Sequence, residues 1–147
     1  MRKIIILFIP ILFCYLVSQD TTEGTPHVFN NELTNDIGSI HMPYVDHNQM
    51  LSEDEYRAPN TPFRYGKKFD TDYNFFELAT KENIDNTREI WRLEVVSLGA
   101  YALSLGYSSY WMPQGAEMYV YDSDKTMFFG AYGAINNNAN GFFSTPL

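Results

Sequence analysis

The sequence predicts a mainly β fold: an antiparallel, jelly-roll-like β-sandwich that is incomplete at the C-terminus and follows a loop-rich extended segment. Three observations lead to this expectation. Apolar and polar residues alternate along several short stretches from residue 90 onward. Gly, Pro, Asn and Asp residues separate these stretches at intervals of roughly 8–12 residues, which is typical of sandwiches. The 147 residues include 11 Tyr, 11 Phe and 2 Trp, which supply large apolar side chains for a core.

The first element, residues 1–19, has the organisation of a secretory signal peptide. Two basic residues follow Met1, and residues 4–17 form an apolar run that ends at polar residues. The run is shorter than the ~20 apolar residues that a bilayer span requires, and its length suits a signal sequence. An uncleaved N-terminal anchor is the alternative. We therefore expect a secreted, extracellular protein, or a periplasmic one, with no membrane association once the signal is removed.

The only cysteine, Cys14, lies inside this expected signal. Phe13 precedes it at the position where a lipoprotein signal carries a small residue, which disfavours lipidation. Removal of the signal leaves an exported chain without a thiol. We therefore expect no disulfide, no cysteine-zinc site and no cysteine nucleophile.

The charge balance excludes one class of partner. The chain has 10 Lys and Arg against 18 Asp and Glu, a net charge of -8. Nucleic-acid binding needs basic residues clustered on one face to neutralise phosphates. Nucleic acid is therefore not an expected partner.

Residues 20–87 are expected to form a loop-rich prosegment. They contain few aliphatic residues, many Asn, Asp and Glu, and several prolines, without a sustained period of 3.6 or 2. Ser52 followed three residues later by Glu55 predicts a short helical turn over residues 51–56. Prolines 59 and 62 then end it.

Residues 88–147 are expected to form the sandwich domain, truncated at its end. The alternating stretches predict strands over residues 90–96, 101–107, 116–121 and 126–132, with a fifth strand beginning at residue 142.

Trp91 opens the first of these strands, on the face that also carries Leu93 and Val95. The alternation places that face inward. We therefore expect Trp91 in the sandwich core, together with Leu103, Leu105, Met118 and Val120.

Several short motifs occur in a fixed order along residues 26–147. They are Ser52-Glu53-Asp54, Pro62-Phe63-Arg64-Tyr65-Gly66, Ile90-Trp91-Arg92-Leu93, Ser97-Leu98-Gly99-Ala100, Met112-Pro113 with Gly115-Ala116 and Met118 to Asp122, Gly130-Ala131-Tyr132, and Ser144-Thr145-Pro146. This order resembles the N-terminal region of secreted bacterial, lysyl-endopeptidase-like serine proteases of the trypsin type. The resemblance implies a prosegment and a small β-sandwich that precede the catalytic domain, with the protease domain of the same parent chain as partner.

The residues themselves contain no recognisable catalytic constellation. A trypsin-type site needs a nucleophilic serine near glycine-rich turns, a histidine base and an orienting carboxylate. No Gly-x-Ser-x-Gly or Gly-Asp-Ser-Gly sequence occurs, and His27, His41 and His47 all lie in the loop-rich segment. We expect no catalytic residue, no cofactor and no metal in this chain, although the parent protein is expected to be a trypsin-like endopeptidase.

Two acidic clusters have simple interpretations. Asp122 and Asp124 lack the remaining oxygen ligands and the glycine of a calcium loop, so a turn stabilised by Asx-type hydrogen bonds is expected. The cluster at residues 53–55 is expected to be a solvated acidic surface, with docking on a basic partner surface as the alternative.

Five residues are candidates for structural or contact roles. Arg64, between two aromatic residues, is expected to pair with an acid of this chain or to contact the protease domain. The other four are Trp91, Trp111, Tyr119 and Tyr121. With Tyr107 and Tyr110, the last three are numerous enough to line a carbohydrate platform, since sugars stack on exposed rings. We expect them instead in the sandwich core and in cross-strand pairs, with the platform as the alternative.

The leading functional hypothesis is a non-catalytic pro and accessory region of an exported lysyl-endopeptidase-like serine endopeptidase. The alternative is a stand-alone secreted β-sandwich module that binds polysaccharide or a cell-surface partner.

Overall fold

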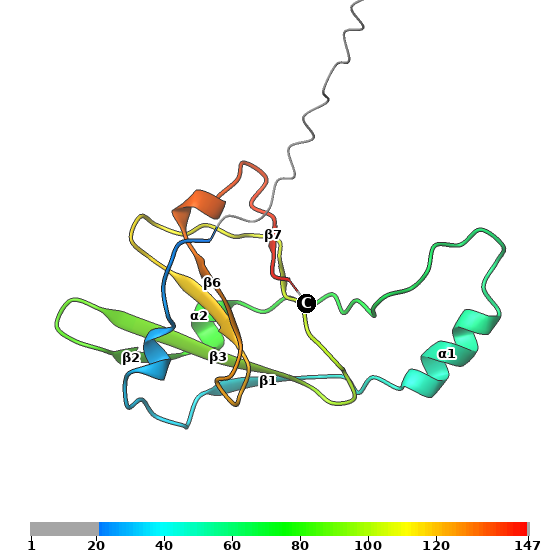
Figure 1. Cartoon of the computed structure of the whole chain (residues 1–147), viewed down its shortest axis with the longest axis horizontal. Coiled ribbons are helices and arrows are strands. Elements are labelled where there is room, and N and C mark those ends of the chain that lie inside the picture. The colour runs from blue at the N-terminus through cyan, green and yellow to red at the C-terminus, as the bar shows by residue number, and fades with distance from the viewer. Residues whose placement is uncertain (1–20, 147) are drawn as a thin grey trace, which may run out of the picture.

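The computed structural model describes residues 21–146 (Figure 1). The expected signal peptide, residues 1–19, lies outside the described residues. The chain is mainly β, as predicted, with short strands and few helices. In chain order the elements are η1 (His27–Phe29), β1 (Gly38–Met42), α1 (His47–Glu55), α2 (Phe75–Leu78), β2 (Thr80–Asn83), β3 (Glu89–Ser97), β4 (Gly106–Tyr107), β5 (Met118–Tyr121), β6 (Phe128–Tyr132), η2 (Ala134–Asn136) and β7 (Phe143–Ser144). The sheets they form are small and open.

The largest sheet has the strand order β1-β3-β2. Strand β1 runs parallel to β3, with Gly38 opposite Leu93, and β2 runs antiparallel to β3, with Thr80 opposite Arg92. The sheet therefore joins strands from both sides of the expected boundary between residues 87 and 88. The apolar pattern predicts neither β1 nor β2, because both strands are short. Strand β1 buries only Ile40, so backbone pairing rather than apolar periodicity defines this strand.

Gly38 is required where β1 begins. Its amide donates to the Oγ1 atom of Thr80 at 2.8 Å. A Cβ atom at this position would lie 2.0 Å from the carbonyl oxygen of Leu78. Only glycine allows the chain that leads into β2 to pass so close to β1.

The aromatic core lies between two further strand pairs, β4 with β7 and β5 with β6, both antiparallel. Tyr110, Tyr132 and Phe143 are buried there, with Tyr110 stacked on Phe143 at a centroid distance of 4.4 Å and Tyr132 edge-on to it at 5.0 Å. Burial raises the pKa of Tyr132, and burial together with neighbouring tyrosines raises that of Tyr110 to about 12. These phenols remain neutral in the core.

The first described residues cover strand β6. Thr22 and Ala131 exchange backbone hydrogen bonds of 3.2 and 3.3 Å. Val28 is buried, and the ring of Phe29 makes edge contacts with Tyr121 and Phe128, each at 5.7 Å. Residues 21–30 are therefore packed against the β5–β6 pair, where Figure 1 draws them in blue.

Two expectations from the alternating pattern are wrong. Of the strand expected over residues 101–107, only Gly106–Tyr107 is a strand, and Tyr101 and Leu103 are exposed. Trp91 does not lie in the core: it is half-buried, edge-on to Phe76 at 5.1 Å and 5.0 Å below the Nζ atom of Lys81. Alternation identifies one face of a strand, but the elements packed on the sheet decide how deeply that face is buried.

The opposite face of β3 carries the buried Arg92, which is 8% exposed. Its Nη2 atom donates to the backbone oxygen of Thr34 at 2.6 Å and to the Oε2 atom of Glu82. The other oxygen of Glu82 accepts the backbone N–H of Thr34 at 2.9 Å. This triad joins β2, β3 and the segment that leads into β1.

The first prediction concerns the pH dependence of this triad. The hydrogen bond from the Thr34 amide, and then that from Arg92, lower the pKa of Glu82 below its ordinary value of 4.5. Because the folded-state pKa is depressed, Glu82 contributes stability above about pH 4.5, and this contribution is lost as the pH falls through the folded-state value. The difference in thermal midpoint between the parent and Glu82→Gln should therefore shrink between about pH 6 and about pH 3. A constant difference across that range would contradict the assignment.

The second prediction ranks three aromatic residues by burial. Tyr132→Ala should cost about 3–5 kcal/mol of unfolding free energy, because it leaves a cavity in the core. Trp91→Ala should cost about half as much, and Trp111→Ala, at a side chain that is 74% exposed, less than about 0.5 kcal/mol. Urea titrations of the three variants measure the order. Equal effects of Trp91→Ala and Tyr132→Ala would contradict it.

Candidate functional site: an aromatic arm around helix α1

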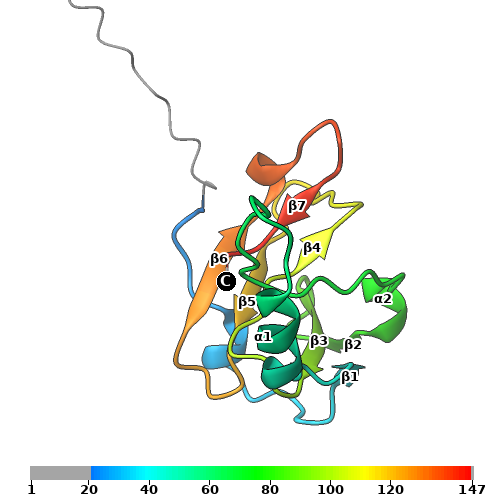
Figure 2. The same cartoon turned by 90° about the vertical axis from the view of Figure 1, so that its right-hand side faces the viewer.

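Residues 43–66 form an arm that projects from the rest of the molecule (Figures 1 and 2). It contains a short lead from β1, helix α1 and the chain that folds back along the helix. Helix α1 has no buried residue. The large apolar side chains exposed on the arm are Tyr44, Leu51, Tyr56, Phe63 and Tyr65.

The base of the arm is fixed on the loop that follows β3. Val45 is buried, and its amide donates to the carbonyl of Leu98 at 2.9 Å. The ring of His47 stacks on that of Tyr101, with centroids 4.1 Å apart. Gly99 has a φ of +84°, and a Cβ there would lie 2.4 Å from the carbonyl oxygen of Val45. The close approach of the arm to this turn therefore requires glycine.

Helix α1 begins at an Asp46 cap, whose carboxylate accepts the amide of Gln49 at 3.1 Å. The cap expected at Ser52 is wrong, because the helix begins six residues earlier, nearly two turns. Asp46 and Gln49 have the spacing of a capping box, which is the signal that predicts the true start. The expected turn is therefore a nine-residue helix.

Arg64 holds the returning chain against the helix. Its Nη1 atom lies 3.0 Å from the Oε2 atom of Glu53, and its Nη2 atom lies 2.7 Å from the Oδ1 atom of Asp54. Nη2 also donates to the carbonyl of Met50 at 2.5 Å. The bond from Arg64, followed by one from Gln49, lowers the pKa of Glu53, while the bond to Glu53 raises that of Arg64. Arg64 thus has intramolecular acidic partners, and the cluster at residues 53–55 is in part neutralised.

Arg57 makes a second connection within the arm. Its Nη1 atom donates to the carbonyl of Pro62 at 2.9 Å, and its Nε atom lies 3.4 Å from Asp54. The guanidinium also lies 5.1 Å from the centre of the Phe63 ring. Two arginines therefore fix the return loop through polar and cation–π contacts rather than through an apolar core.

The aromatic residues that are numerous enough to line a carbohydrate platform are not brought together in one place. Trp111 is exposed on a loop between β4 and β5, whereas Tyr119 and Tyr121 lie on β5 and contact Phe128 and Phe29. The Tyr119 hydroxyl donates to Glu117 at 3.0 Å, and burial followed by the hydrogen bond to Glu117 raises its pKa to about 12. The two tyrosines serve as cross-strand and packing residues.

Trp111 is nevertheless held firmly at its backbone. The preceding residue, Tyr110, is in the core, and its amide donates to the carbonyl of Gly141 at 2.7 Å. The side chain of Asn137 binds both backbone groups of the following residue, Met112. Its Oδ1 atom accepts from the Met112 amide and its Nδ2 atom donates to the Met112 carbonyl, each at 2.8 Å. An exposed indole is therefore presented on a fixed loop.

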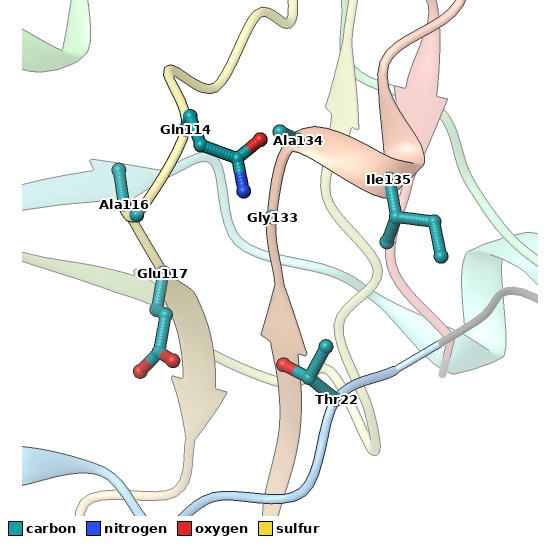
Figure 3. Close-up of a pocket in the computed structure, with 8 residues that line it drawn as sticks. Thr22, Gln114, Ala116, Glu117, Gly133, Ala134 and Ile135 are labelled. Carbon is teal, nitrogen blue, oxygen red and sulfur yellow. The ribbon is translucent and has the colours of Figure 1, made fainter.

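A shallow cleft of about 400 Å³ lies beside the N-terminal segment (Figure 3). Its walls are Thr22, Gln114, Gly115, Ala116, Glu117, Gly133, Ala134 and Ile135. The side chains of Gln114 and Glu117 come from one wall and those of Thr22 and Ile135 from the other. Since Glu117 already accepts the Tyr119 hydroxyl, the cleft combines one engaged carboxylate with a few neutral groups.

The remaining candidates have local roles. Asp122 accepts the amides of Thr126 and Met127 at 2.7 and 2.9 Å, so its side chain stabilises the turn as expected, although these amides are four and five residues on and not the two of an Asx turn. The Nε2 atom of His41 lies 3.0 Å from the Ser39 hydroxyl. Among residues 21–146, no group of three His, Cys, Asp or Glu side chains is arranged to hold a metal ion. In the same part of the chain, no helix has the length and apolar character needed to cross a bilayer.

Comparison with known proteins gives no relative: no family model, no curated protein and no solved structure matches this chain.

The third prediction tests the role of Arg64 in the arm. Arg64→Ala should release the return loop and increase amide hydrogen exchange in α1 several-fold, because a helix without buried residues depends on these polar contacts. Exchange in β3 should not change. Lys68→Ala, which removes an ion pair whose partners are each 82% exposed, is the matched control. Unchanged exchange in α1 of Arg64→Ala would contradict the assignment.

Proposed function

We propose that this chain is the non-catalytic N-terminal pro and accessory region of an exported serine endopeptidase of the lysyl-endopeptidase type, and that it binds the protease domain through the arm. The order of short motifs along residues 26–147 supports the family. The observation that carries the binding role is the set of exposed aromatic side chains held on the arm. We further propose that residues 1–19 are a signal peptide and that the protein is exported.

The arm has the properties of a binding surface. Tyr56, Phe63 and Tyr65 are 87–92% exposed, so their burial against a partner would remove a large apolar area from water. Because Arg64 and Arg57 already fix the loop that carries them, little conformational entropy is lost on binding. Aromatic and arginine side chains dominate the binding energy of interfaces.

Two of the family motifs meet in this arm. Ser52-Glu53-Asp54 lies in α1, and Pro62-Phe63-Arg64-Tyr65-Gly66 forms the return loop. The ion pairs of Arg64 with Glu53 and Asp54 connect the two motifs directly. Two motifs that carry the resemblance and lie apart in the sequence therefore form one structural unit.

The pairs β4–β7 and β5–β6 share the core of Tyr110, Tyr132 and Phe143. We propose that they belong to an antiparallel, jelly-roll-like sandwich.

The alternative, a module that binds polysaccharide or a cell-surface partner, is favoured by one observation. Trp111 is 74% exposed on a loop that Asn137 and Tyr110 hold in place. A rigidly presented indole can stack on a sugar ring. Binding that depended on Trp111 and not on the arm would support this alternative.

The fourth prediction tests the arm as the binding surface. The purified chain should bind the protease domain of a lysyl endopeptidase and should itself hydrolyse no peptide or ester substrate. Combined Tyr56→Ser, Phe63→Ser and Tyr65→Ser substitutions should weaken this binding by about 100-fold or more, since each buried aromatic contributes about 1–2 kcal/mol. Isothermal titration calorimetry measures the affinity.

Phe142→Ser is the matched control, because Phe142 is also exposed but lies in the loop before β7, outside the arm. It should bind as the parent does. Equal affinity of the arm variant and the parent, or no binding by the parent, would contradict the proposal. Serine-inhibitor-sensitive hydrolysis by the chain alone would contradict its non-catalytic role.

A further inference from the structure

Residues 66–73 connect the arm to α2 without regular secondary structure (Figure 1, green). Within the described part of the chain, their backbone makes no hydrogen bond to another backbone or side-chain group. Seven of the eight are exposed, and a Cβ built on Gly66 would meet open space. An endoprotease binds a substrate segment through its unpaired backbone, so this segment can enter a protease cleft without prior unfolding.

The segment contains two adjacent lysines whose side chains are weakly held. Lys68 pairs only with Asp70, and both side chains are 82% exposed. Lys67 lies 5.4 Å from the centre of the Phe69 ring. Such exposed contacts contribute little, so either lysine can leave its neighbour for a specificity pocket.

The other basic residues among residues 21–146 lie in ordered surroundings. Arg57 and Arg64 fix the return loop of the arm, Lys81 and Arg92 are in strands, Arg88 is paired with Asp85 in the β2–β3 turn, and Lys125 is in the turn closed by Asp122. Cleavage after any of these requires local opening of hydrogen-bonded structure first.

We propose that residues 66–73 are a processing site, cut after Lys67 or Lys68 by an endoprotease that accepts lysine on the acyl side of the scissile bond. In this hydrolysis one water molecule is consumed. The C–N bond after the lysine breaks, its carbonyl carbon becomes a carboxylate, and the nitrogen of the next residue leaves as a free amine. The inference rests on the conformation of this chain and not on the function proposed above.

The cut would not separate the two parts. The N-terminal part would still pair with β3 along the whole of β1. The Thr34 carbonyl would still accept from Arg92, and Thr22 would still exchange two hydrogen bonds with Ala131. Processing would therefore produce a nicked, two-chain molecule in which the arm is no longer covalently linked to α2.

The fifth prediction tests this site by limited digestion of the native chain with a trace of lysine-specific endoprotease. Intact-mass measurement should show one early cut, after Lys67 or Lys68. The two fragments should elute together with the volume of the uncut protein on native size exclusion and separate in denaturant. A first cut elsewhere, or separate elution under native conditions, would overturn the proposal.

The control is a pair of matched variants. Lys67→Gln combined with Lys68→Gln should slow the first cut by about tenfold or more, since the remaining sites are reached only through local opening. Lys81→Gln, at a lysine of β2, should be cut at the parent rate. Circular dichroism verifies that both variants keep the parent fold. Digestion of the double variant at the parent rate would refute the site, whereas failure to bind a protease domain would bear only on the proposed function.

Discussion

The buried pair of Arg92 and Glu82 is the contact on which the arrangement of the main sheet depends. It joins the β2–β3 hairpin to Thr34. Residues 34–38 then lead into β1, which pairs with β3 along the edge opposite β2. Removing two charges from water costs much of what their attraction supplies, and the Nε atom of Arg92 is buried with no hydrogen-bond partner among the described residues. The effect of the pair therefore lies mainly in where it places the N-terminal segment, and less in net stability.

The position of β1 in turn decides where the arm can go. Because β1 is parallel to β3, both strands end on the same side of the sheet, where Val45 pairs with the loop that follows β3. The arm leaves from that point. Strand β2 is antiparallel to β3 and pairs with its other edge, so the chain must pass from one edge of the sheet to the other before β2 begins. The connection contains the arm, residues 66–73 and α2, and β2 then returns the chain toward the start of β3. The exposed arm and the unpaired segment therefore lie in the one connection that links the two edge strands.

Sequence reasoning predicted the local strands well and the long-range pairing poorly. The strands near residues 90–96, 116–121 and 126–132 were anticipated because each places apolar side chains at every second position. Strand β1 has no such signal, since its pairing is held by the backbone and by Thr80 and Arg92, which are more than 40 residues away. The arm was not predicted for the same reason. Its ion pairs join Glu53 and Asp54 of one motif to Arg64 of another, and neither motif alone indicates that the other lies beside it.

The arm is held in a fixed shape although helix α1 buries none of its side chains. A short helix usually keeps its shape by packing an apolar face on a core, and that face is then lost to any other role. In α1 no residue is buried, and charged and capping contacts from Asp46, Arg57 and Arg64 supply the constraints instead. The aromatic side chains of the return loop therefore remain exposed in the folded chain. A surface that is held in shape without using its apolar groups leaves those groups free to meet a partner, which is why the arm, rather than the aromatic core, supports a binding role.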